Sequence, residues 1–162
     1  MVIQILYYEI IDIFIRKLAA MKKLIIGMLL LGNPCVYAQE WINDLDVAFK
    51  EAGADNKRVL LYFSVPDACD ICKQLEENVL RSDEFQAYAK ANFILAQPDF
   101  SESLSTAEKA ENLLIVEKYN KDGFFPLVVV LDKNAKVLGK TGVYNNETPK
   151  QYLTILESFA KK

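Results

Sequence analysis

The sequence RVLLYFSVPDACDICK occupies residues 58–73. Its first seven residues form an apolar run of strand length, which is typical of a strand buried on both faces. After a short loop, Cys72, Leu75 and Val79 share one face of a helix that begins near Cys69. Cys69 is therefore expected where a strand passes into its helix, at the sheet edge where α/β proteins place their chemistry.

Helical and strand patterns alternate through the rest of the chain. Apolar residues recur at helical spacing from Trp41, so residues 40–52 should form an amphipathic helix that ends near Gly53. This order predicts an α/β fold with a central mixed sheet of about four strands and helices on both faces. The other elements expected are a helix capped by Ser82, a strand at 92–97, a helix opened by a Ser105–Glu108 capping box, hairpin strands at 126–132 and 136–140, and a last helix opened by Thr148 and Pro149.

The first 38 residues have the pattern of processed sequence. Residues 21–38 contain two lysines, an apolar stretch and the tripeptide Val-Tyr-Ala, which is the form of a secretory signal peptide cleaved before Gln39. The apolar stretch is shorter than the roughly 20 residues of a membrane span, although an uncleaved anchor is the alternative. Residues 1–20 are interpreted as a leader upstream of the true start; a longer n-region or an amphipathic surface helix are the alternatives.

Residues 39–162 are then expected to form one exported domain, periplasmic or extracellular. The whole chain has 162 residues, 52% of them hydrophobic and 25% charged, and a net charge of −3, which is ordinary globular composition. Removal of residues 1–38 takes away four basic and two acidic residues and leaves a net charge of −5. Because no run of basic residues is present, nucleic acid is excluded as an expected partner, and we expect a monomer.

The two cysteines of the mature chain allow three interpretations, since Cys35 leaves with the signal peptide. A metal site of the usual kind is excluded, because it needs more Cys or His ligands than two cysteines and no histidine provide. A structural disulfide across two residues would remove little entropy from the unfolded chain. In a redox pair, the start of the helix would stabilise the thiolate of Cys69 as the nucleophile, and Cys72, one turn further, would resolve the mixed disulfide.

These features together resemble the thioredoxin superfamily. The resemblance rests on the order of elements, CDICK at residues 69–73 and GFFPLVVV at 123–130. The Trp41 segment and NKRVLLYFS at 56–64 are similar to the exported branch that includes the C-terminal domain of membrane thiol-disulfide transporters. Over residues 40–160 the resemblance implies a thioredoxin-like fold.

The resemblance also implies a substrate site beside the cysteines. Pro126 would be the cis-proline next to the disulfide, and Phe125 would offer its backbone to a substrate peptide. The alternative for Pro126 is an ordinary proline that opens a strand.

The sequence departs from the family pattern at three places. Ala68 stands where the family has an aromatic residue, Asp70-Ile71 replaces Gly-Pro between the cysteines, and Tyr62 lies where an acid is often buried. Asp67 is the candidate substitute for that acid, or else a solvated loop residue. Asp70 disfavours a thiolate beside it, which favours electron donation by the pair.

We therefore expect an exported thiol-disulfide oxidoreductase that acts on protein disulfides, as a reductant and without a cofactor. Cys69 and Cys72 are the candidate catalytic residues, Phe125 and Pro126 bind substrate, and the modulators are Asp67, Asp70 and Lys73. Its partners would be disulfide-containing proteins and a membrane or soluble thiol that supplies electrons. The alternative is a non-catalytic peptide-binding module with the same fold and an oxidised cysteine pair.

Mass spectrometry of the exported protein should find Gln39 at the N-terminus, because the tripeptide before it is the best-formed cleavage site after the apolar stretch. A mature species that still carries Leu24 to Leu31 would instead indicate a membrane anchor.

Overall fold

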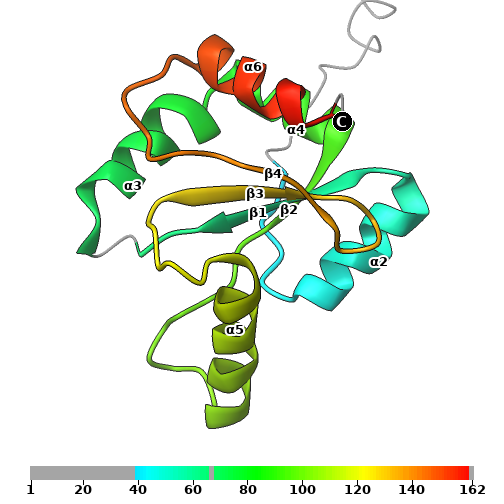
Figure 1. Ribbon diagram of the computed structural model, residues 1–162, viewed down its shortest axis with the longest axis vertical. Helices are drawn as coiled ribbons and strands as arrows, with labels where there is room; N and C mark the ends of the chain where they lie inside the picture. The colour runs from blue at the N-terminus through cyan, green and yellow to red at the C-terminus, as the bar shows by residue number, and fades with distance from the viewer. Residues whose placement is uncertain (1–38, 66–67, 161–162) are drawn as a thin grey trace, which may run out of the picture. The chain divides into compact units, whose positions relative to one another are not determined.

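A computed structural model describes residues 39–65 and 68–160 of the chain. The leader, the signal peptide, Cys35 and Asp67 lie outside these residues. The helices and strands follow in the predicted order, and helices cover both faces of a central sheet (Figure 1). No helix among the described residues is long and apolar enough to cross a membrane.

The sheet has four strands in the spatial order β2-β1-β3-β4. β1 pairs in parallel with β2, because a helical crossover joins them, and β3 is antiparallel to both β1 and β4. The predicted mixed sheet of about four strands is thus confirmed. Its strands are β1 (Arg58–Phe63), β2 (Phe93–Ala96), β3 (Leu127–Leu131) and β4 (Val137–Lys140).

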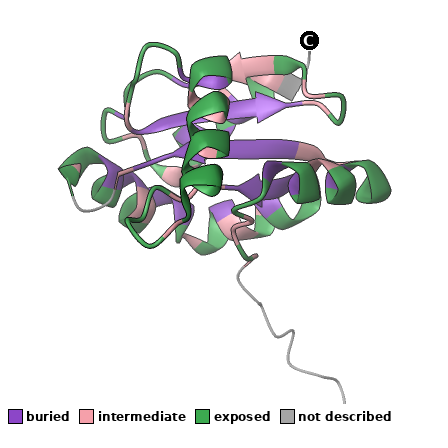
Figure 2. Cartoon of the chain, turned by 90° about the horizontal axis from the view of Figure 1, so that it is seen from below, coloured by how far each residue is buried: buried purple, intermediate pink, exposed green. Residues whose placement is uncertain are grey.

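Successive side chains of β1 enter two separate cores on opposite sides of the sheet. Leu60 and Tyr62 contribute to the core under α3, η2, α4 and α6, whereas Val59, Leu61 and Phe63 contribute to the core under α2 and the end of α5. Figure 2 shows β1, β2 and β3 largely buried, whereas the edge strand β4 and the outer helix surfaces are more exposed. The helices are α2 (Leu45–Asp55), α3 (Asp70–Leu75), the π-helical η2 (Glu76–Leu80), α4 (Asp83–Asn92), α5 (Thr106–Tyr119) and α6 (Pro149–Ala160).

The predicted helix caps are present in the structure. The side chain of Ser82 accepts a hydrogen bond from the Phe85 N–H at the start of α4. Ser105 and Glu108 form the reciprocal capping box of α5. These local signals fixed where the helices begin, because each satisfies N–H groups that the helix itself leaves unpaired.

The first helix begins and ends later than predicted. Residues before Asp44 are extended: Ile42 pairs with Ala96, and its N–H donates to the Leu95 carbonyl at 2.9 Å. Asp44 then caps α2 by accepting hydrogen bonds from two backbone N–H groups of the first turn. The helix continues past Gly53 and ends where Asn56 adopts a left-handed conformation, with φ of 52°. Trp41, which was expected on the helix, packs instead on the Tyr62 ring, with 5.6 Å between ring centroids.

Gly139 in β4 supports an aromatic ring of the last helix. A Cβ atom at this position would collide with the Phe159 ring of α6, which is half-buried and packs on the core beneath it. The absence of a side chain at Gly139 therefore lets α6 approach the edge of the sheet closely.

Replacing Gly139 with alanine should lower the free energy of unfolding by about 1–3 kcal/mol, because the methyl group would displace the Phe159 ring. Gly142 is the matched control: nothing lies within 4 Å of a Cβ built there. Gly142→Ala should change stability by less than about 0.5 kcal/mol. Urea denaturation at constant m-value compares the two. Equal midpoints for wild type and Gly139→Ala would mean that the ring moves aside without cost.

Candidate active site

Cys69 and Cys72 form a disulfide at the start of α3, after the loop that follows β1. Cys69 is the N-cap of α3, and its sulfur accepts a hydrogen bond from the Cys72 N–H at 3.1 Å. The two Cα atoms are 5.2 Å apart. The predicted position of Cys69 at the start of the helix is therefore confirmed.

The two sulfur-bearing residues differ in accessibility. Cys72 is completely buried, whereas Cys69 is half-exposed. Cys69 can therefore be reached from solvent, whereas Cys72 is shielded by the protein. Across residues 39–65 and 68–160, no three His, Cys, Asp or Glu side chains are grouped as metal ligands.

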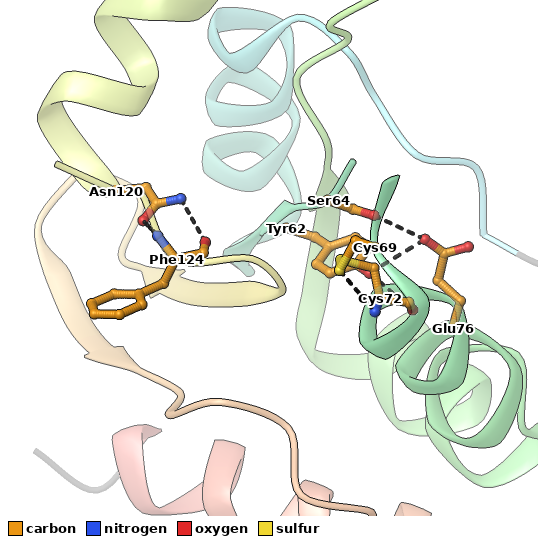
Figure 3. Close-up of a disulfide and its surroundings, with 7 residues drawn as sticks. All are labelled: Tyr62, Ser64, Cys69, Cys72, Glu76, Asn120 and Phe124. Atoms are coloured by element: carbon orange, nitrogen blue, oxygen red, sulfur yellow. Dashed lines mark hydrogen bonds between the residues drawn. A yellow bond between two sulfur atoms is a disulfide. The ribbon is translucent and has the colours of Figure 1, made fainter. Parts of the chain in front are cut away.

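Beneath the disulfide, two hydroxyl groups converge on one carboxylate oxygen (Figure 3). The Tyr62 hydroxyl donates to Glu76 Oε1 at 3.3 Å, and the Ser64 hydroxyl donates to the same atom at 3.2 Å. The Tyr62 hydroxyl also lies 3.5 Å from the Cys72 carbonyl oxygen. Tyr62 and Ser64 come from the end of β1, and Glu76 follows Cys72 by one helical turn, so the cluster links strand and helix next to the buried thiol.

The protonation of Tyr62 fixes the direction of these hydrogen bonds. Burial raises the pKa of Tyr62 well above its ordinary value. The hydrogen bond with Ser64 lowers this pKa by less than burial raises it, and the nearby Glu76 carboxylate raises it further. Tyr62 therefore keeps its proton throughout the physiological range. It acts as a donor, and Glu76 acts as the acceptor.

Glu76 is the residue that the sequence interpretation missed. Sequence spacing could have indicated Glu76, because a residue four positions after Cys72 lies on the same helix face as Cys72. Tyr62 faces that side of the sheet. Asp67, which the sequence offers as the substitute acid, lies outside the described residues. Asp70 and Lys73 are exposed, and among the described residues their side chains form no hydrogen bond or ion pair.

Phe125 and Pro126 lie where β3 begins. Phe63 pairs with Leu127, so the start of β3 is beside the end of β1, from which the chain runs to Cys69. The Phe125–Pro126 peptide bond is cis, as the family resemblance implies. The side chain of Phe125 is half-buried against the α2 side of the core.

The turn before these residues is held by a buried side chain. Asn120, only 2% exposed, accepts a hydrogen bond from the Phe124 N–H at 3.0 Å and donates one to the Phe124 carbonyl at 2.8 Å (Figure 3). The Phe124 ring itself is 54% exposed. Asn120 thus fixes the backbone that leads to Pro126, a role that no sequence pattern indicates.

Known proteins share both the sequence pattern and the fold. Residues 45–157 match the family model described as a thioredoxin-like domain. The disulfide bond reductase DsbH of Chlamydia pneumoniae is 27% identical over 97 residues. That alignment covers 59% of this chain and 58% of the length of the curated relative.

Solved structures agree on the fold. A structure of a DsbH oxidoreductase superposes with a TM-score of 0.70 at 23% identity, covering 80% of this chain and 90% of that one. A thioredoxin from Thermus thermophilus gives 0.59 at 20% identity, with coverage of 76% and 88%. The oxidised C-terminal domain of DsbD from Neisseria meningitidis gives 0.52 at 20% identity, with coverage of 74% and 98%. The chain belongs to the thioredoxin-like domain family.

Proposed function

We propose that this protein is a thiol-disulfide oxidoreductase that exchanges its Cys69–Cys72 disulfide with the disulfides of other proteins. The observation that carries the proposal is the pairing of an accessible cysteine at a helix start with a fully buried cysteine one turn further. The name of the Chlamydia relative, a disulfide bond reductase, supports the same chemistry.

The exchange proceeds in two steps that conserve atoms and electrons. In the reduced protein, the thiolate of Cys69 attacks a substrate disulfide, forms a mixed disulfide and releases one substrate sulfur as a thiolate. The thiolate of Cys72 then attacks the Cys69 sulfur and releases the second substrate thiol. The substrate gains two electrons, the protein is left with the disulfide, and a thiol donor must reduce it again.

The second step needs a group that takes the proton of Cys72, because this buried thiol has no direct contact with solvent. Glu76 is the group available, since its carboxylate lies one helical turn away and accepts hydrogen bonds from Tyr62 and Ser64. The Tyr62 hydroxyl, placed between Glu76 and the Cys72 carbonyl, fixes the carboxylate beneath the disulfide. In this proposal Glu76 is the general base for Cys72.

Electron flow runs from this protein to its substrates. Asp70 is the first residue of α3 and directly follows Cys69, so its carboxylate opposes the stabilisation of the Cys69 thiolate by the helix start. A thiolate that is weakly stabilised leaves the disulfide as the favoured form, which makes the dithiol a reductant.

We place this reaction outside the cytoplasm, in the periplasm or extracellular space. Gln39, the expected first residue after cleavage, is tied to the folded domain: its side-chain amide donates to the Phe93 carbonyl at 2.9 Å. A chain that began at Gln39 would therefore keep every helix and strand that the structure describes. The partners in this compartment are disulfide-containing proteins and a soluble or membrane-bound thiol that supplies electrons, and the protein acts as a monomer.

The reduced protein should reduce an insulin-type disulfide substrate, and variants of the two cysteines should separate their roles. Cys72→Ser should accumulate mixed disulfides with its substrates, because the resolving thiol is missing. Cys69→Ser should form few, since the remaining Cys72 is buried. Non-reducing gels of both variants, before and after reductant, count the adducts. Equal trapping by both would contradict the order of attack, and a wild type that binds insulin without turnover would favour the binding module.

Replacing Glu76 with glutamine should slow release of the mixed disulfide on the order of 100-fold near neutral pH, because the general base is lost while its shape is kept. The loss should shrink as pH rises, since a larger fraction of Cys72 is then already the thiolate and needs no general base. Stopped-flow measurement across pH gives both results. The matched control is Glu77→Gln, which neutralises the adjacent, exposed acid. If Glu76→Gln and Glu77→Gln slowed release equally, the change in net charge would be the cause, and Glu76 would not be the general base.

A further inference from the structure

A cavity of about 510 Å³ lies beside the residue that precedes Cys69. Three segments line it: the stretch before α2, the residues Ser64, Val65 and Ala68 after β1, and the residues that follow β2. Its wall residues include Asn43, Ser64, Ala68, Gln97, Asp99 and Phe100. Because Ala68 has only a methyl group, the space next to the Cys69 backbone stays open.

The wall carries two neutral amide side chains. Among the described residues, the side chains of Asn43 and Gln97 have no hydrogen-bond partner in the protein. Their backbones are fixed, because the Gln97 N–H donates to the Ile42 carbonyl at 2.9 Å and so ties the two segments together. A carboxamide both donates and accepts hydrogen bonds, which matches the N–H and C=O groups of a peptide backbone.

The charge of the wall disfavours anions. The Asp99 carboxylate is held by the Ser101 N–H at 2.8 Å and by its hydroxyl at 3.0 Å. No lysine or arginine lines the described part of the cavity. Asp70, two positions after the wall residue Ala68, adds an exposed carboxylate outside the cavity. A ligand rich in carboxylates, such as glutathione disulfide, would meet repulsion without a cationic partner.

The wall also offers an aromatic contact and a link to the redox centre. Phe100 is 36% exposed and supplies apolar surface for a side chain of the ligand. Ser64 lies on the same wall and donates to Glu76, the carboxylate proposed as the base for Cys72. A ligand in this cavity would therefore contact Ala68, which precedes the attacking cysteine, and the wall that contains Ser64, the hydrogen-bond donor to Glu76.

We infer that this cavity binds a neutral, extended segment of the substrate protein beside its cysteine. Asn43 and Gln97 pair with the peptide backbone, and Phe100 packs against an apolar or aromatic side chain. The inference rests on the proposed exchange reaction and adds a substrate class to it: protein segments with apolar residues around the cysteine, in preference to acidic segments and to glutathione.

Binding of a peptide without a thiol tests the cavity apart from the chemistry. The probe is a dye-labelled peptide Gly-Phe-Ser-Phe-Gly, blocked at both ends, with serine in place of the substrate cysteine. Fluorescence anisotropy with the oxidised protein gives its Kd. A matched peptide with aspartate in place of both phenylalanines should bind at least about tenfold more weakly, since it loses the apolar contact and meets Asp99.

Two variants locate the binding. Asn43→Ala combined with Gln97→Ala should weaken binding of the phenylalanine peptide about tenfold through the loss of two hydrogen bonds. Asn78→Ala, which removes an exposed amide on η2 outside the cavity, should have no effect. Ala68→Trp should fill the cavity without removing any hydrogen bond and should weaken binding as well. Urea midpoints check that each variant is folded.

Equal binding of the phenylalanine and aspartate peptides would overturn the inference. So would wild-type affinity for the phenylalanine peptide in both the Asn43→Ala/Gln97→Ala double variant and the Ala68→Trp variant. Failure of both peptides to bind would also overturn it. If the phenylalanine peptide binds as expected but the reduced protein leaves insulin-type disulfides intact, the cavity stands and the proposed exchange reaction fails. The two proposals are therefore separable.

Discussion

Five consecutive side chains of β1, from Val59 to Phe63, are each at most 1% exposed. A strand buried on both faces must be covered by helices on both sides and paired at both edges. β2 and β3 pair with the two edges of β1, and the helices before and after the strand pack on its two faces. Each fully buried apolar side chain contributes about 1.5–3 kcal/mol, so this strand is a large part of the stability of the domain. Its end is rigid for the same reason, and the active site begins there.

The rigid end of β1 serves the cysteine pair in two ways. The chain leaves the sheet and enters α3 with Cys69 as its cap, so one sulfur is held at the surface and the other is carried one turn into the core. The same strand supplies Tyr62 and Ser64, whose hydroxyl groups hold Glu76 beneath the pair. The family often has a buried acid within this strand. In this chain the carboxylate belongs to Glu76 at the start of η2, and the hydroxyl groups of Tyr62 and Ser64 donate hydrogen bonds to it. The desolvation of the carboxylate is thereby compensated.

Much of the fold could be predicted from the sequence, because its signals are local. The apolar run of β1, the caps at Ser82 and Ser105 and the hairpin after β3 each depend on residues close in the chain. The extended segment before α2 could not be predicted in this way. The apolar spacing from Trp41 is compatible with a helix, but pairing of Ile42 with Ala96, more than 50 positions away, makes that segment an added strand edge. Likewise, Gly139 acquires its role only when Phe159 of the last helix packs over it.

The sequence by itself determined the strand-to-helix position of Cys69, the helical spacing to Cys72 and the family resemblance that places a proline at the start of β3. These follow from periodicity and capping, which act over a few residues. Only the tertiary structure decided that Glu76 accepts hydrogen bonds from Tyr62 and Ser64, that Asn120 holds the turn before Pro126, and that a cavity opens beside Ala68. Each of these depends on which side chains from distant segments share one space, and that is fixed when both faces of the sheet are packed.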